Sequence, residues 1–151
     1  AYVNCWNVND HQSAALWEQY VDSPQGLAMR TTVERLRQSL DIDGRVFTYG
    51  NVEYIDFSND KIPNGSIPSI YHKRNSFEHE NEYRVSYLSS EDERLGNGFY
   101  ADVNVGVLVD RIVITPISPD WFSELVKQVL DRYGIECQLE ESKLYSKSTN
   151  Y

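Results

Sequence analysis

Residues 73–87 have the sequence KRNSFEHENEYRVSY, which holds the densest set of ionisable side chains in the chain. Its second half alternates in the manner of a strand that packs against a core, with Tyr83, Val85 and Tyr87 two residues apart. A core strand that also carries a line of charges is a local conflict, and such conflicts concentrate at functional sites. We therefore predict a strand over about 78–88 and treat the rest of the chain as its scaffold.

Alternate residues of a strand lie on the same face of the sheet. This parity puts Tyr83, Val85 and Tyr87 on the core side. The opposite face then carries a charged row, formed by Glu78, Glu80, Glu82 and Arg84. We expect that row to face solvent or a cleft.

The two central carboxylates are candidates for acid–base chemistry. Glu80 and Glu82 would lie roughly 6.7 Å apart along a strand, and Arg84 beside Glu82 would keep Glu82 ionised. Glu80 is then the better candidate for the protonated partner, and a neutral carboxyl beside an ionised one suits acid–base work. The alternative is a solvent-facing charge ladder with salt bridges to residues such as Lys73 or Arg30.

The composition limits the class of protein. The 151 residues fit one domain, and 40% hydrophobic residues support a core. The net charge of −9 argues against binding to nucleic acid, whose affinity comes from Lys and Arg. The three histidines lack the spacing of a metal site, no apolar stretch approaches the ~20 residues of a membrane span, and the two distant cysteines fit a reduced, cytoplasmic protein.

The order of expected elements predicts an α+β domain with a mainly antiparallel sheet and about three helices packed on it. Helices are expected over 11–21, after a capping box at Thr31 and Glu34, and from Pro119 to Gly134. The expected strands are residues 1–6, which we interpret as buried, and 27–30, 45–49, 52–57, 78–88, 100–103, 111–115 and 135–139. Gly50-Asn51 is expected to join two of these strands as a hairpin.

The chain resembles a bacterial and phage family, domain of unknown function 2971. The resemblance rests on VNCW at 3–6, Ala15-Leu16-Trp17-x-x-Tyr20, Gly26-Leu27-Ala28, Val52-x-Tyr54, Ile112-Val113-Ile114-x-Pro116, and above all Lys73-x-x-x-Phe77-x-x-Glu80-Asn81-Glu82-x-Arg84. It implies a further N-terminal part that precedes residue 1, so that residues 1–151 would be a single domain lacking that portion. It implies no established activity.

A more distant resemblance is to ADP-ribosyltransferases, in which a strand carries Glu-x-Glu. Glu80-Asn81-Glu82 is similar to that motif, which implies that Glu82 polarises the nicotinamide ribose of NAD while Glu80 orients the acceptor. On this analogy Lys73 and Arg84 would bind the substrate, a nucleotide-type small molecule, and Trp17 and Tyr20 would wall the pocket. The competing interpretation of Trp17 and Tyr20 is core packing.

Two functions therefore compete. The first is an enzyme that acts through Glu80 and Glu82, with NAD as its expected cofactor. The second is a non-catalytic binding or regulatory module in a phage-defence or toxin system, with a protein partner. A cleft over Glu82 favours the first, and a flat, exposed row of glutamates favours the second.

Overall fold

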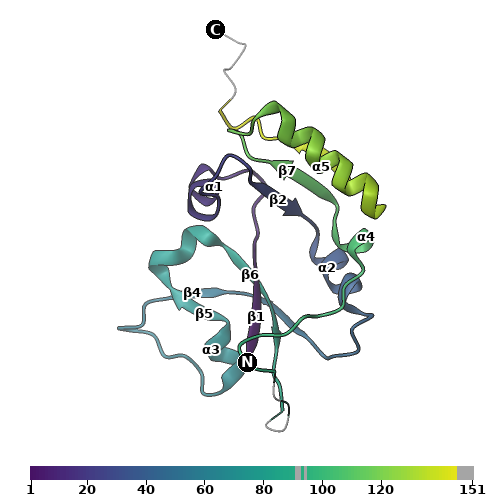
Figure 1. Cartoon of the computed structure of the whole chain (residues 1–151). Helices are drawn as coiled ribbons and strands as arrows, with labels where there is room; N and C mark the ends of the chain where they lie inside the picture. Colours follow the sequence, from purple (N-terminus) through teal and green to yellow (C-terminus); the bar gives the residue numbers. More distant parts are fainter. Residues whose placement is uncertain (91–92, 94, 146–151) are drawn as a thin grey trace. The chain divides into compact units, whose positions relative to one another are not determined.

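The fold was obtained as a computed structural model, which describes residues 1–90, 93 and 95–145. Figure 1 shows the helices and short strands of an α+β fold, and among the described residues antiparallel strand pairings outnumber parallel ones. This confirms the predicted fold class. The chain divides into two compact units, unit 1 (Ala1–His11 and Arg45–Tyr100) and unit 2 (Gln12–Gly44 and Ala101–Tyr151). The single domain stays a prediction.

Unit 1 is organised around a central strand that comes from the charged stretch. Its elements are β1 (Tyr2–Asn7), β3 (Thr48–Asn51), β4 (Glu53–Ile55), α3 (Ser66–Ile70), β5 (His72–Arg74), the 3₁₀ helix η1 (Asn75–Glu80) and β6 (Glu82–Tyr87). Strand β6 pairs antiparallel with β1 on one side and with β3 on the other. A second, parallel sheet is formed by β4 and β5. Tyr83 and Val85 of β6 are buried, as the alternation predicts, but Tyr87 is only partly buried, and Glu82 and Ser86 on the opposite face are buried as well.

Three predictions for unit 1 are wrong. Residues 78–80 are the end of η1 rather than strand, and β6 begins only at Glu82. Strands β3 and β4 do not form a hairpin through Gly50-Asn51, because β3 pairs with β6 and β4 with β5. Strand β1 is not buried, because most of its side chains are exposed beside the central strand.

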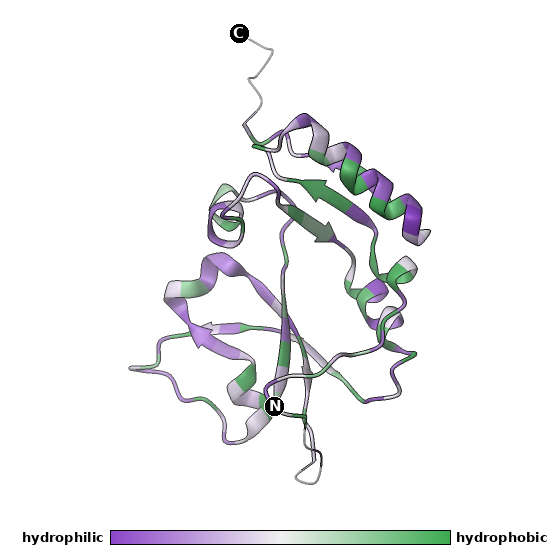
Figure 2. Ribbon diagram, in the orientation of Figure 1, coloured by the Kyte–Doolittle hydropathy of each residue, from purple (hydrophilic) through white to green (hydrophobic). Residues whose placement is uncertain are grey.

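Unit 2 is a three-stranded sheet with a long helix packed on it. Its elements are α1 (Ala14–Tyr20), β2 (Leu27–Arg30), α2 (Val33–Leu40), α4 (Val105–Leu108), β7 (Arg111–Ile114), α5 (Asp120–Tyr133) and β8 (Gln138–Glu141). Strand β7 lies between β2, which is antiparallel to it, and β8, which is parallel. Ile112 and Ile114 of this strand pack with Phe122 and Val126 of α5. Figure 2 shows the hydrophobic colour of β7 along most of its length.

The caps explain where the helices begin and end. Thr32 caps α2 by accepting a hydrogen bond from Arg35 N, so the predicted capping box at Thr31 is one residue too early. Ser13 caps α1, which shortens the helix predicted over 11–21. Gly134 ends α5 with φ 63°, the left-handed conformation that favours glycine at this position. This predicted end is confirmed.

Two further expectations for unit 2 are corrected. The strand predicted over 100–103 is not formed, because residues 101–104 are irregular and lead into α4. The closing strand is displaced toward the C-terminus, since β8 begins at Gln138 rather than at Ile135. Ile135 instead packs against the core below α5, as does Cys137.

Candidate functional site: a buried ion cluster

The charged stretch folds into a compact cluster of two carboxylates and two cations in unit 1. Lys73 Nζ lies 2.6 Å from Glu80 Oε2 and 2.8 Å from Glu82 Oε1. The other oxygen of Glu82, Oε2, is 2.6 Å from both Nε and Nη2 of Arg84. Lys73, Glu80, Glu82 and Arg84 therefore form one alternating chain of charges, which we call the ion cluster. Its formal charge is zero.

Burial makes this cluster unusual. Glu80 is 3% exposed and Glu82 is 5% exposed, while the Lys73 side chain retains 23% exposure. Buried carboxylates are stable as anions only when opposite charges and hydrogen bonds replace water. Here, both oxygens of Glu82 are occupied by cations. The carboxylates are thus held inside the unit and do not form a row on its surface.

The backbone at Asn81 brings the two carboxylates to the same lysine. Asn81 has φ 41°, in the left-handed region, and it separates the end of η1 from the start of β6. Its side chain donates to Val8 O, and its backbone carbonyl accepts from Val8 N at 2.8 Å. Asn7 fixes the same turn by donating from Nδ2 to Glu80 O at 2.7 Å. The end of β1 therefore clamps the turn that orients the carboxylates.

Aromatic residues complete the surroundings of the cluster. The Tyr54 hydroxyl accepts a hydrogen bond of 2.8 Å from the backbone N–H of Glu82. Lys73 Nζ lies 4.6 Å from the centre of the Phe77 ring, a cation–π contact that partly replaces hydration. Arg84 also donates from Nη1 to Ile70 O, at the end of α3. The cluster thus ties α3, β4, β5, η1 and β6 together.

The electrostatics follow from these contacts. Burial raises the pKa of Glu82, but the hydrogen bonds that Lys73 and Arg84 donate to it help to outweigh this effect, and the pKa of Glu82 is lowered from 4.5 to about 2. Burial opposes the charge on Lys73, yet its bonds to Glu80 and Glu82 raise its pKa above the ordinary value. Burial likewise opposes the charge on Arg84, but its hydrogen bond and charge interaction with Glu82 outweigh this effect and raise the pKa of Arg84. Glu82, Lys73 and Arg84 therefore stay charged at neutral pH.

We expect Glu82 to titrate well below an ordinary glutamate. A ¹³C carboxyl NMR titration between pH 7 and pH 1.5 is expected to give an apparent pKa of about 2 for Glu82, because protonation must break its contacts with Lys73 and Arg84. A midpoint for Glu82 near 4.3, the value of an unperturbed glutamate, contradicts the geometry of the cluster.

The sequence predictions for this stretch have mixed outcomes. Lys73 bridges both central carboxylates, as the charge-ladder interpretation proposed, and Arg84 keeps Glu82 ionised. The expectation that the row faces solvent or a cleft is wrong for Glu80 and Glu82, because both are buried. Arg30 belongs to β2 of unit 2, so its expected bridge to the carboxylates of unit 1 stays a prediction.

The predicted aromatic wall lies on α1 of unit 2. Trp17 is half-buried and donates from Nε1 to Gln12 Oε1 at 3.3 Å. Tyr20 is 60% exposed, so core packing is the wrong interpretation for this residue. Because α1 and the ion cluster belong to different units, a substrate wall made by Trp17 and Tyr20 stays a prediction.

Two residues of the site were not among the predicted ones. Asn81 was expected to lie within the strand over 78–88, but its left-handed backbone makes it the residue that orients both carboxylates. Tyr54 contributes the hydroxyl that binds the Glu82 backbone. Tyr54 was visible in the pattern Val52-x-Tyr54, but nothing in its spacing connected it with a carboxylate 28 residues later.

No metal centre or membrane span accompanies the cluster in the described part of the chain. Within residues 1–90, 93 and 95–145, no group of three or more His, Cys, Asp or Glu is placed to hold a metal ion. Across the same residues, no helix has the length and apolar character needed to cross a membrane. The Cys5 thiol lies near Glu82, and burial together with that carboxylate raises its pKa, which is the opposite of what activates a thiolate.

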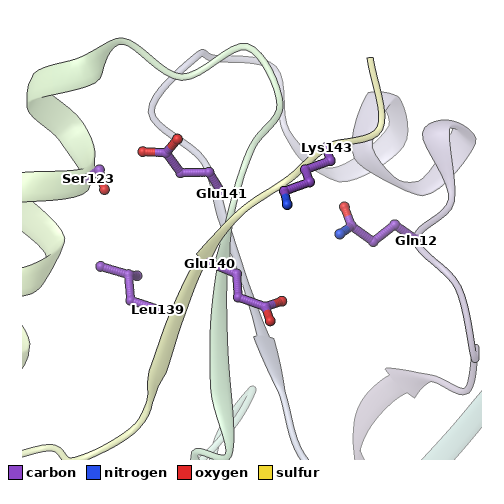
Figure 3. Close-up of a pocket in the computed structure, with 6 residues that line it drawn as sticks. All are labelled: Gln12, Ser123, Leu139, Glu140, Glu141 and Lys143. Carbon is purple, nitrogen blue, oxygen red and sulfur yellow. The ribbon is translucent and has the colours of Figure 1, made fainter. Parts of the chain in front are cut away.

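A pocket of about 520 Å³ lies in unit 2, and one of the residues that line it, Gln12, accepts a hydrogen bond from the predicted site residue Trp17. It is lined by Gln12, Ser123, Leu139, Glu140, Glu141 and Lys143. Figure 3 shows Glu140 and Glu141 leaving β8 in opposite directions, as neighbouring strand residues do. Glu140 is already paired with Arg111 at 2.6 Å. The carboxylates of this pocket therefore do not converge on one ligand position.

Comparisons of the chain with protein-family models, with curated proteins and with solved structures each gave no match. The resemblances described above thus stay predictions that rest on their residue patterns.

Proposed function

We propose that this chain is a non-catalytic binding module in which the Glu-x-Glu stretch stabilises the fold. The observation that supports this proposal is that both carboxylate oxygens of Glu82 are already engaged by cationic side chains. It is 5% exposed, Lys73 holds one of its oxygens, and Arg84 holds the other. A carboxylate that acts on a substrate needs a reacting atom within hydrogen-bonding reach. Glu82 uses both oxygens for contacts within unit 1.

The energetic cost of releasing Glu82 supports the same proposal. Breaking a buried pair leaves an uncompensated buried charge, which costs about 3–5 kcal/mol. A substrate that engaged Glu82 would have to replace its contacts with Lys73 and Arg84. The contacts of Arg84 with Ile70 and of Asn81 with Val8 hold the cluster in place and add to that cost.

One observation favours the second candidate, NAD-dependent ADP-ribosyl transfer. Such chemistry needs an ionised carboxylate, and the pKa of Glu82 is lowered to about 2. Glu80 lies two residues before Glu82 in the chain, and both carboxylates contact Lys73. These features are compatible with a Glu-x-Glu pair in which Glu82 stays charged, and they justify a direct test.

NAD consumption tests the two proposals against each other. We expect wild type and Glu82→Gln to release nicotinamide at the same background rate, because the wild-type carboxylate is fully engaged by Lys73 and Arg84. The assay is run at a temperature where circular dichroism shows both proteins to be folded. Glu78→Gln, which changes an exposed neighbour, is the matched control. Turnover by wild type and Glu78→Gln together with a silent Glu82→Gln variant would overturn the non-catalytic proposal.

A further inference from the structure

Strand β8 lies at an edge of the sheet of unit 2, because the strand order is β2-β7-β8. Gln138 N and Ser142 N donate hydrogen bonds of 3.4 and 3.0 Å to backbone carbonyls at the two ends of β7. Neighbouring strand residues direct their N–H and C=O groups to opposite edges, so those of Leu139 and Glu141 face away from β7. In the described part of the chain, no strand pairs with this edge.

The pocket of about 520 Å³ follows this free edge. Leu139 and Glu141 line it from the face of β8 that packs toward α5, together with Ser123 of that helix, and Glu140 lines it from the opposite face (Figure 3). A pocket that touches both faces of an edge strand reaches around the free edge, because β7 occupies the other edge. The space therefore lies where the next strand of the sheet would lie.

The free backbone groups indicate the kind of ligand. An edge strand with unpaired N–H and C=O groups is a template for another strand. A small molecule needs polar groups that converge on it, and the carboxylates of this pocket point apart. An extended peptide instead bonds with the main chain of Leu139 and Glu141 and places its side chains on both faces. Antiparallel addition is the more stable of the two orientations.

Charge selects one side chain of that peptide. Glu141 is exposed, and among the residues that the structure describes no cation is paired with it, whereas Glu140 is paired across the sheet. Figure 3 shows the Glu141 carboxylate on the Ser123 side of β8 and Lys143 on the other side. Lys127, one turn after Ser123 on α5, does not line the pocket. Glu141 therefore favours Lys or Arg at the facing position of the peptide.

We propose that β8 binds an extended peptide of a partner protein, which adds antiparallel to the free edge with Lys or Arg opposite Glu141 and an apolar side chain opposite Leu139. Because β8 runs from Leu139 to Glu141, the basic residue comes two positions before the apolar one in the peptide. This inference rests on the proposed function as a binding module, and it names the partner by its chemistry. Main-chain hydrogen bonds supply the affinity, and the two facing side chains supply the selectivity.

Two synthetic peptides of identical composition test the proposal with the full chain. Both contain about seven residues, one lysine and one valine among threonines, with lysine two positions before valine in the first peptide and two positions after it in the second. The first peptide is expected to bind saturably and to protect the amide protons of Leu139 and Glu141 from exchange. The second is expected to bind at least about threefold more weakly, because no single register satisfies both positions.

Two variants assign the selectivity to Glu141. Glu141→Gln is expected to abolish the difference between the two peptides, because the facing carboxylate is lost. Glu136→Gln changes an exposed glutamate of the same unit outside β8, and it is expected to leave the difference unchanged.

Backbone methylation of the first peptide separates strand addition from other modes of binding. The N–H groups of its lysine and valine face β8 in the antiparallel register, so N-methylation of both is expected to abolish saturable binding. The N–H groups of the adjacent threonines face away from β8. N-methylation there is expected to change the dissociation constant by less than about threefold.

Equal affinity of the two methylated peptides, equal affinity of the two lysine–valine orders, or no saturable binding would overturn the inference. Protection of Leu139 and Glu141 in a concentration-dependent dimer without peptide would also overturn it, by assigning the edge to a second copy. The NAD assay reports on Glu82 of unit 1 and does not involve β8, so failure here is distinct from failure of the proposed function.

Discussion

Replacing Lys73 by methionine is expected to lower the free energy of unfolding by about 3–5 kcal/mol. Lys73 is the cation shared by Glu80 and Glu82, at 2.6 and 2.8 Å, and both carboxylates are buried. Methionine keeps much of the volume beside Phe77 but removes the charge. Glu80 then has no cation in the cluster, and its ionised form becomes an uncompensated buried charge.

Urea denaturation followed by circular dichroism measures this loss, and hydrogen exchange of the β6 amides localises it to unit 1. Lys61→Met is the matched control, because Lys61 is an exposed lysine of the same unit. We expect Lys61→Met to change the stability by less than about 0.5 kcal/mol. If both methionine variants are equally stable, Lys73 does not hold the two carboxylates in the folded protein.

Glu82→Gln is expected to have the second large effect, a loss of about 3–5 kcal/mol at pH 7. Glutamine keeps the shape of the side chain but removes the anion that neutralises Arg84. It also removes one of the two carboxylates that contact Lys73. It also places an amide N–H₂ opposite donors. The substitution is measured in the same urea titrations, with Glu78→Gln as the control, because Glu78 is exposed on η1.

The pH dependence of Glu82→Gln provides an independent check. Because the folded pKa of Glu82 is lowered from 4.5 to about 2, its stabilisation is present above pH 4.5 and is lost as the pH falls toward 2. The shift corresponds to about 3 kcal/mol. Wild type is therefore expected to lose more stability than Glu82→Gln between these pH values. Parallel stability curves for the two proteins would show that Glu82 is not held as an ion.

Local signals predicted the parts of the fold that depend on nearby residues. Helix α5 was visible from Pro119, its apolar period and Gly134, which all act in the helix or next to its ends, although Pro119 is the N-cap and the helix begins one residue later, at Asp120. Strand β2 was also predicted with its observed bounds. The pairing of Lys73 with Glu80 and Glu82 could be anticipated because opposite charges lie within ten residues of one another.

The features that were missed depend on distant partners or on one backbone conformation. Strands β3 and β4 are almost adjacent in the chain, yet they pair with β6 and β5, which a turn signal at Gly50-Asn51 cannot reveal. The strand prediction ran through Asn81 because strand alternation takes no account of a left-handed residue that ends η1. The left-handed backbone of Asn81 is therefore the main difference between the predicted surface row of glutamates and the observed buried ion cluster.

A double-mutant cycle between Lys73→Met and Glu82→Gln tests most directly whether the cluster is a coupled structural unit. The free energies of unfolding of wild type, the two single variants and the double variant are measured at pH 7 under identical conditions. Because the two side chains share a buried contact of 2.8 Å, we predict that the double variant is more stable than the sum of the single losses implies. The expected coupling energy is about 1.5–3 kcal/mol. Additive losses, with a coupling energy within about 0.5 kcal/mol of zero, would contradict the account.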